Sequence, residues 1–239
     1  MEKLASFFDG KSVHRVLDIG TGSGEFIRMI SDVFPEEVYI VGVDPSAEAL
    51  AVAQTGNYNR KVSFLQMEGE NLHFEDESFD VVSMSNAMHH LADPGKTLSE
   101  MKRVVKQGGW LLIAEIVSDG LNDAQENQKT LHHLKSFVDR KSGISHRETW
   151  TEAEVLDIVC SNRVRPALTF SYNRMANPIT DTARLATWEN DFARHLKSLE
   201  GYPDYDEKVK LFGLFKQRLA QFGFQQARQV VIVGAKIQD

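Results

Sequence analysis

The chain has 239 residues, which is enough for one large α/β domain or for a domain with an appended lid. Its hydrophobic content is 42% and no long apolar run occurs, so we expect a globular cytoplasmic protein without a signal peptide or a membrane span. The net charge is −7 and no block of Lys and Arg occurs, which argues against avid binding of DNA or RNA, because such binding depends on neutralising many phosphates.

A glycine-rich turn near the N-terminus is the first strong pattern. Residues 16–19 form a short apolar run that predicts a buried strand, and the apolar spacing of residues 26–30 predicts a helix. Between them lie three alternate glycines, Gly20, Gly22 and Gly24. Glycines at a strand-to-helix turn can adopt positive φ and allow a ligand to approach closely. The turn is therefore expected to bind a nucleotide-like ligand, with an ordinary turn that binds nothing as the alternative.

The charges around this turn indicate the kind of ligand. The dinucleotide fingerprint G-x-G-x-x-G needs a glycine at position 25, where this chain has Glu25. Glu25 would repel a pyrophosphate at the helix N-terminus, and Asp18 adds a second negative charge. A positively charged ligand fits better. The string from Val16 to Glu25 resembles motif I of the class I S-adenosylmethionine (SAM)-dependent methyltransferases, which implies SAM as the cofactor.

An acid ends the second predicted strand. Residues 38–44 are apolar up to Asp44, and Pro45 then begins a helix over residues 47–54. Asp44 lies about 20 residues past the glycine turn, where a βαβ unit delivers a carboxylate to the ribose hydroxyls of a nucleotide. The alternative is that Asp44 caps the following helix.

The third predicted strand, residues 62–67, also leads into acidic residues. In the methyltransferases that the chain resembles, an acid after this strand accepts a hydrogen bond from the adenine amine, and the neighbouring N–H contacts a ring nitrogen. The resemblance assigns these roles to Glu68 and Gly69. The family more often has Asp at this position and Pro where this chain has His73. A solvated loop acid is the alternative reading of Glu68.

The next motifs narrow the resemblance. Residues 78–82, followed by 89–94, are similar to small-molecule methyltransferases of the ubiquinone/menaquinone-biosynthesis type, and a strand is expected over residues 80–85. An amphipathic helix is predicted over residues 98–106, closed by the glycines at 108 and 109, and a strand over 110–116. The resemblance covers roughly residues 14–118, which we expect to form the cofactor-binding half.

The residues that we expect to contact the cofactor are Asp18, Gly20, Thr21, Gly22, Gly24, Asp44, Pro45, Glu68, Gly69, Glu70, Ser85, Asn86 and His90. No catalytic side chain is assigned, because many enzymes of this type need only to orient the acceptor. One of His89, His90 or His146 could act as a general base.

The second half predicts helices and two final strands, at residues 165–172 and 229–236. The family normally joins these strands by a hairpin, whereas here residues 173–224 intervene with two predicted helices. We expect one methyltransferase domain over residues 1–239, with segments 119–150 and 173–224 as helical lid or substrate-side segments. The insert could also be a dimerisation arm, giving a homodimer, or surface decoration. The implied fold class is α/β, a Rossmann-like, doubly wound, seven-stranded sheet with its last strand antiparallel and a helical insert between strands six and seven.

Histidine and cysteine patterns predict no metal site, since neither H-x-x-x-H nor C-x-x-C occurs. The single cysteine, Cys160, lies in an apolar-periodic stretch and is expected to be a buried helix thiol.

The expected function is methyl transfer from SAM to a small molecule by in-line displacement, releasing S-adenosylhomocysteine. Two alternatives stay open: a SAM-fold binding or regulatory protein that transfers no methyl group, and a nucleic-acid or protein methyltransferase. Against methylation of nucleic acid, the chain has Asn86-Ala87-Met88-His89 where base-amino methyltransferases have an Asn/Asp-Pro-Pro-aromatic string. We therefore expect no nucleic-acid partner.

Overall fold

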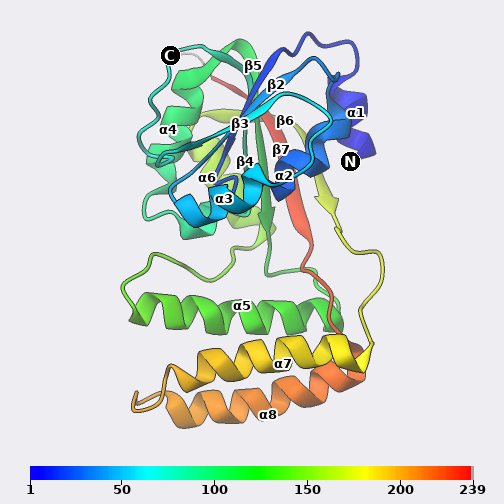
Figure 1. The fold of residues 1–239 in the computed structure, drawn as a ribbon, viewed down its shortest axis with the longest axis vertical. Coiled ribbons are helices and arrows are strands. Elements are labelled where there is room, and N and C mark those ends of the chain that lie inside the picture. Colours follow the sequence, from blue (N-terminus) through cyan, green and yellow to red (C-terminus); the bar gives the residue numbers. More distant parts are fainter. Residues whose placement is uncertain (238–239) are drawn as a thin grey trace. The chain divides into compact units, whose positions relative to one another are not determined.

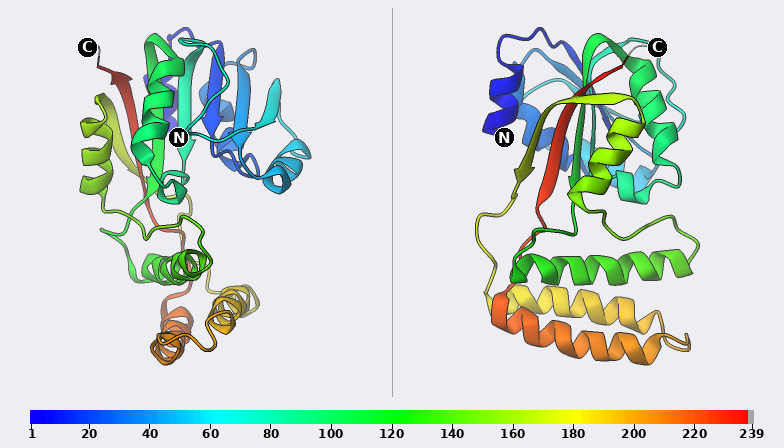
Figure 2. Two further views of the ribbon diagram at one scale, coloured as in Figure 1. Left: turned by 90° about the vertical axis from the view of Figure 1, so that its left-hand side faces the viewer. Right: turned by 180° about the vertical axis from the view of Figure 1, so that it is seen from behind.

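Seven strands form one sheet in the computed structural model, which describes residues 1–237. Their order across the sheet is β3-β2-β1-β4-β5-β7-β6. Strands β1 to β5 pair in parallel, and β7 runs in the opposite direction (Figure 2). The strands are β1 (Arg15–Ile19), β2 (Tyr39–Asp44), β3 (Val62–Gln66), β4 (Phe79–Ser85), β5 (Val105–Ile116), β6 (Val164–Tyr172) and β7 (Gln229–Lys236). This arrangement confirms the predicted Rossmann-like fold with an antiparallel last strand.

Contacts divide the chain into two units. Unit 1 contains Met1–Glu115, Glu154–Tyr172 and the chain from Val230 onward, and unit 2 contains Ile116–Ala153 and Asn173–Gln229. The chain therefore leaves unit 1 twice and returns to it twice.

Helices cover both faces of the sheet in unit 1. Figure 2 shows α1 and α2 on one side and α4 and α6 on the other. The first pair packs through residues such as Leu4, Ile27 and Ile30 against Val16 and Ile40 of the sheet, and all five side chains are fully buried. The helices of this unit are α1 (Glu2–Phe8), α2 (Glu25–Ile30), the 3₁₀ turn η1 (Ser31–Val33), α3 (Ala47–Gln54), the 3₁₀ turn η2 (Met88–His90), α4 (Pro94–Val104) and α6 (Glu152–Ser161), whose first two residues belong to unit 2.

Strand β5 begins earlier than the sequence predicts. Helix α4 ends at Val104, and Val105 is already extended and pairs with Phe79 of β4. Gly108, with φ +72°, lies in this irregular start of the strand rather than capping the helix. The predicted glycine C-cap is therefore wrong. The reason is a tertiary contact: the register shifts between Phe79 and Val81, which accommodates the glycines in a bulge.

Cys160 is exposed, which corrects the prediction of a buried thiol. Helix α6 buries Val155 and Val159, which are four residues apart on one face. The residue after Val159 is turned about 100° away from that face, so the thiol of Cys160 points to solvent.

Unit 2 consists mainly of three long helices that lie side by side (Figure 1). They are α5 (Asp123–Lys141), α7 (Thr182–Lys197) and α8 (Tyr205–Phe222), and the last two occupy the insert between β6 and β7 where the sequence predicts two helices. Asn122 and Gln125 form a reciprocal capping box that begins α5.

The core of unit 2 is built from apolar residues at helical spacing. Phe192 of α7 is fully buried and its ring lies 4.8 Å from that of Phe215 of α8. Trp188 stacks on Phe224 at 3.9 Å, next to the short bridge between Ile179 and Phe224. Leu131 and Leu134 supply the contribution of α5 to the same cluster. Unit 2 thus has a hydrophobic core of its own.

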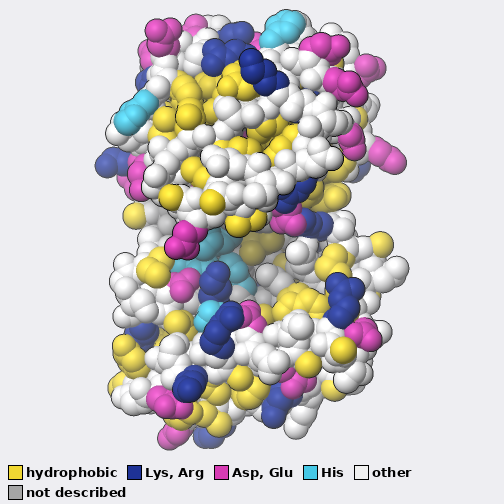
Figure 3. Space-filling model, viewed as in Figure 1, with side chains coloured by type: hydrophobic (Ala, Val, Ile, Leu, Met, Phe, Trp, Pro, Cys, Tyr) yellow, Lys and Arg dark blue, Asp and Glu magenta, His cyan; other side chains and the backbone are white. Residues whose placement is uncertain are grey.

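The surface carries charges of both signs. On the face that Figure 3 shows, Lys and Arg side chains are interspersed with Asp and Glu. Among residues 1–237, no helix is both long and apolar enough to cross a bilayer.

Candidate cofactor site

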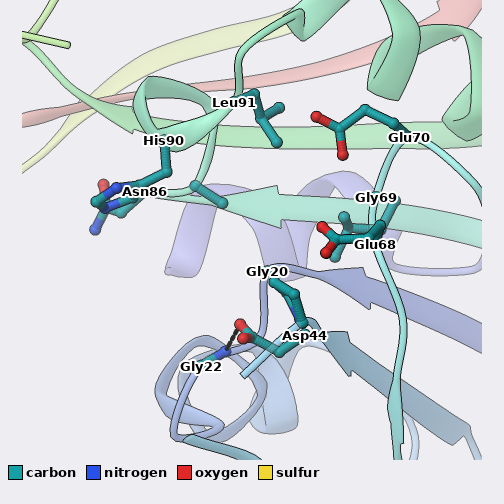
Figure 4. A pocket seen from close by; sticks show the side chains of 12 residues that line it. Gly20, Gly22, Asp44, Glu68, Gly69, Glu70, Asn86, His90 and Leu91 are labelled. Carbon is teal, nitrogen blue, oxygen red and sulfur yellow. Dashed lines mark hydrogen bonds between the residues drawn. The ribbon is translucent and has the colours of Figure 1, made fainter. Parts of the chain in front are cut away.

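A cavity of about 390 Å³ opens in unit 1 where the parallel strands end. Its walls come from the turn after β1, the end of β2, the loop after β3 and the turn after β4 (Figure 4). In open α/β sheets, ligands bind at this carboxyl edge, where the strand order reverses on either side of the first strand. The lining residues are Ile19, Gly20, Gly22, Asp44, Pro45, Glu68, Gly69, Glu70, Asn86, Ala87, His90 and Leu91.

The glycine turn positions the carboxylate of Asp44. The backbone N–H of Gly22 donates to Oδ2 of Asp44 at 2.8 Å, as Figure 4 shows, and the N–H of Ser46 donates to Oδ1 at 2.9 Å. Gly22 has φ +51° and Gly20 has φ +66°, a backbone region that side-chain-bearing residues rarely adopt. The turn therefore needs glycine, and the carboxylate is fixed in one orientation at the cavity wall.

The charged side chains that line the cavity are acidic. Three carboxylates line the cavity, from Asp44, Glu68 and Glu70, and within residues 1–237 no Lys or Arg belongs to the lining. A pyrophosphate would meet like charges here, whereas hydroxyl, amino and cationic groups find hydrogen-bond acceptors. The lining thus fits a cationic nucleoside such as SAM better than a dinucleotide.

Arg103 of α4 anchors the loop that carries Glu68 and Glu70. Its Nη2 donates to the carbonyl of Leu72 at 2.8 Å and its Nη1 to the carbonyl of Phe74 at 2.7 Å. The same guanidinium pairs with Glu100 at 2.8 Å and holds the pKa of that carboxyl below its usual value. Because two backbone carbonyls of the loop accept hydrogen bonds from one rigid guanidinium, the loop has a defined path beside the cavity.

Asp18 lies behind the cavity wall in the middle of the sheet. It is 1% exposed, and its Oδ1 accepts a hydrogen bond from Ser83 at 2.7 Å. Burial raises the pKa of Asp18 to about 6, with the hydroxyl groups of Ser83 and Thr21 opposing the shift and the nearby Asp44 carboxylate adding to it. Asp18 is therefore a buried acid that resists ionisation.

This raised pKa predicts a pH dependence of stability. Between pH 3.8 and about pH 6, the folded protein keeps a proton on Asp18 that the unfolded chain has released, so this group's contribution to stability is lost as the pH rises through that window. We expect Asp18→Asn, which cannot ionise, to gain stability relative to the unsubstituted chain as the pH rises from 4 to 7. Urea unfolding of both proteins across this range tests it, and parallel pH profiles would contradict it.

A second buried acid fixes the turn after β4. Glu115, near the end of β5, is 1% exposed, and its Oε1 lies 2.6 Å from Nδ1 of His89. Its Oε2 accepts the N–H of Met88 at 3.1 Å. The ring of His89 lies 4.3 Å from that of His90, which lines the cavity. By contacting His89 and the backbone of Met88, Glu115 thus holds η2 in position next to the cavity.

The structure brings most of the predicted contact residues to one place. Nine of them line the cavity: Gly20, Gly22, Asp44, Pro45, Glu68, Gly69, Glu70, Asn86 and His90. Four lie outside the lining: Asp18 and Thr21 are buried, Gly24 caps α2, and Ser85 ends β4. Their assignment as cofactor contacts stays a prediction.

Sequence reasoning did not single out four residues that build this region. Ile19, Ala87 and Leu91 line the cavity beside the predicted residues. Nothing in the sequence distinguishes them as lining residues from the other apolar residues of these turns. Glu115 carried a stronger signal, because an acid inside the apolar run from Leu111 to Ile116 requires a buried partner.

The chain is similar in sequence to known methyltransferases over less than half of its length. Residues 17–113 fit a family model described as "Methyltransferase domain". The chain is 36% identical over 108 residues to the uncharacterized methyltransferase YcgJ of Bacillus subtilis, a match that covers 44% of this chain and 42% of that protein. It is 32% identical over 105 residues to the ubiquinone/menaquinone biosynthesis C-methyltransferase UbiE of Geobacter sp., covering 42% and 45%. These matches thus span less than half of either curated relative.

Solved structures share the fold over nearly the whole chain. The crystal structure of YcgJ from Bacillus subtilis superposes with a TM-score of 0.61 at 22% identity, covering 100% of this chain and 98% of that one. A SAM-dependent methyltransferase from Methanosarcina mazei superposes with a TM-score of 0.59 at 16% identity, covering 98% of each. Together, these matches show that residues 17–113 are similar to a methyltransferase domain and that the chain shares the fold of SAM-dependent methyltransferase structures.

Proposed function

We propose that this protein transfers a methyl group from SAM to a small-molecule acceptor and releases S-adenosylhomocysteine. The observation that supports this most is the acidic cavity at the carboxyl edge of β1, β2 and β4, with the carboxylate of Asp44 fixed in its wall. The proposal is also supported by the match of residues 17–113, which include these lining residues, to a methyltransferase domain model.

Different residues of the lining are proposed to bind different parts of the cofactor. Asp44 offers two oriented oxygens to the two ribose hydroxyls, and the remaining lone pairs of these oxygens accept them. Glu68 and Gly69 are proposed to hold the adenine edge. Gly20 and Gly22 let the backbone approach the ligand.

When bound, SAM supplies a methyl group already activated by its sulfonium charge. The protein then needs to bind both molecules, hold the acceptor in line and exclude water, which can contribute roughly 7–11 kcal/mol. The carboxylates of Asp44, Glu68 and Glu70 favour the cation over its neutral product, so they help to bind the cofactor and to release the product.

A small-molecule acceptor is supported by the named activity of the UbiE relatives and by the net charge of −7. Charge repulsion disfavours a nucleic-acid substrate. The roles of segments 119–150 and 173–224, as lid, substrate side or dimerisation arm, stay part of this proposal.

Calorimetric titration of the full chain with SAM and, separately, with NADH tests the cofactor half. We expect SAM to bind with micromolar affinity and NADH not to bind, because the acidic lining repels the pyrophosphate. Release of S-adenosylhomocysteine with any of a panel of small acceptors would support transfer. SAM binding without release across the panel would favour the alternative of a binding protein, and tighter binding of NADH than of SAM would overturn the proposal.

A further inference from the structure

Two histidines of unit 2 face each other across a turn of the chain. His132 lies on α5, and His146 lies in the segment that follows this helix, 14 residues later. Their Nε2 atoms are 3.4 Å apart, and their rings meet edge to face with centroids 4.9 Å apart. His146 is 2% exposed and His132 is half-buried. The Nε2 atoms of the two imidazoles thus point toward each other, and both side chains are at least partly buried.

The position of His146 is fixed by both its side chain and its backbone. Oδ2 of Asp139 lies 2.6 Å from Nδ1 of His146, which favours the neutral tautomer with the proton on Nδ1 and the lone pair on Nε2. Nη1 of Arg140 donates to the carbonyl of His146 at 2.9 Å, and the N–H of Ile144 donates to the carbonyl of Asp139 at 2.9 Å. The imidazole is therefore pre-organised by the helix that carries its partner.

This geometry matches two ligands of one tetrahedral metal ion. Zn²⁺ binds imidazole nitrogen at about 2.0–2.1 Å, so two nitrogens at the tetrahedral angle lie about 3.3–3.4 Å apart. Histidine ligands of metals characteristically donate their other N–H to a carboxylate, which is the arrangement of His146 and Asp139. A direct hydrogen bond between the rings would be long at 3.4 Å.

We propose that His132 and His146 bind a divalent transition-metal ion, with Asp139 as the positioning carboxylate behind His146. Imidazole nitrogens suit Zn²⁺, Cu²⁺ and Ni²⁺ better than Mg²⁺ or Ca²⁺. Two histidines leave further coordination positions for water or other ligands, as in sites that are not closed by four protein ligands. The ion would tie α5 to the segment after it. Sequence patterns predict no such site, because the spacing of 14 residues belongs to no short metal motif.

Zn²⁺ and Co²⁺ are the probes for this site. The full chain is stripped of metal with a chelator and titrated with Zn²⁺ against a chromophoric competitor, and Co²⁺ binding is followed by its visible absorption. We expect one Zn²⁺ per chain and a rise in melting temperature with Zn²⁺ concentration, since the ion binds the folded state. His132→Ala and His146→Ala are each expected to lower the affinity at least tenfold.

Two further variants separate coordination from general effects on unit 2. Asp139→Asn keeps both nitrogens and is expected to weaken Zn²⁺ by about 10–100-fold. His133→Ala is the matched control, because His133 neighbours His132 on α5 but pairs with Thr149. The affinity of this variant for Zn²⁺ should stay within about twofold of that of the unsubstituted chain. His146 is buried, so His146→Ala could fail to fold. In that case the test uses His132→Ala, because His132 is only half-buried. A chain that binds no Zn²⁺, or one whose His132→Ala variant binds as tightly, would overturn the proposal.

Discussion

Replacing Asp44 with Ala should weaken SAM binding by at least about 100-fold. Each hydrogen bond to a charged acceptor contributes about 1.5–3 kcal/mol, and the proposed role of Asp44 is to accept two ribose hydroxyls at once. Its oxygens are already oriented by the N–H groups of Gly22 and Ser46, so little ordering of the carboxylate remains to be done when the cofactor binds. Calorimetric titration of the variant measures the effect, and circular dichroism checks that the variant is folded.

Glu48→Ala is the matched control for this loss. Glu48 is an exposed acid in the first turn of α3, close to Asp44 in sequence, and it is not part of the cavity lining. The control removes the same charge while leaving the hydrogen bonds in place, and we expect its affinity to change less than about threefold because exposed charges are screened. Equal losses in the two variants would mean that the field of the acids, rather than the fixed carboxylate, binds the cofactor.

The second large effect is expected from Gly20→Ala. A Cβ at this position would lie 2.5 Å from Cβ of Ala87, and the residue has φ +66°. The left-handed conformation costs about 1–2 kcal/mol for a non-glycine residue, and overpacking adds about 1–3 kcal/mol. We therefore expect the free energy of unfolding to fall by about 2–5 kcal/mol, measured by urea denaturation.

Two variants separate the two causes. Gly10 has a similar φ of +70°, but a Cβ there meets nothing within 4 Å, so Gly10→Ala should show the backbone cost alone. Adding Ala87→Gly to Gly20→Ala removes the colliding methyl group and should recover the overpacking part. If Gly20→Ala destabilised the protein no more than Gly10→Ala, the close contact between the turns after β1 and β4 would not exist in solution.

The elements that the sequence predicts well are those whose cause is local. Runs rich in apolar residues, such as residues 39–43 and 79–84, become largely buried strands, and the glycines at 20, 22 and 24 all adopt positive φ. Asp44 is predictable because a strand end and the spacing from the glycine turn place it together with that turn. These features need only periodicity and residue chemistry.

The features that sequence reasoning missed depend on a distant partner. Val105 is extended because it pairs with Phe79, 26 positions earlier, which overrides the helical pattern before it. Glu115 is tolerated in a buried strand because His89 contacts it. The convergence of His132 and His146 likewise depends on the path of the chain between them. The acid of Glu115 within an apolar run indicates that a buried partner exists, but short sequence spacing does not identify the partner in any of these three pairings.

The position of β7 has a consequence for how the protein is made. This strand lies between β5 and β6 in the sheet, although it follows both of them along the chain. As the chain leaves the ribosome, β1 to β5 can pair in turn, whereas β6 has no neighbour until synthesis has passed all of α7 and α8. During that interval β5 presents an open hydrogen-bonding edge of buried apolar residues such as Leu112 and Ile113. The nascent protein is thus most prone to aggregate while α7 and α8 are being synthesised. Once β7 is complete, it pairs with both β5 and β6 and covers the exposed edge of β5.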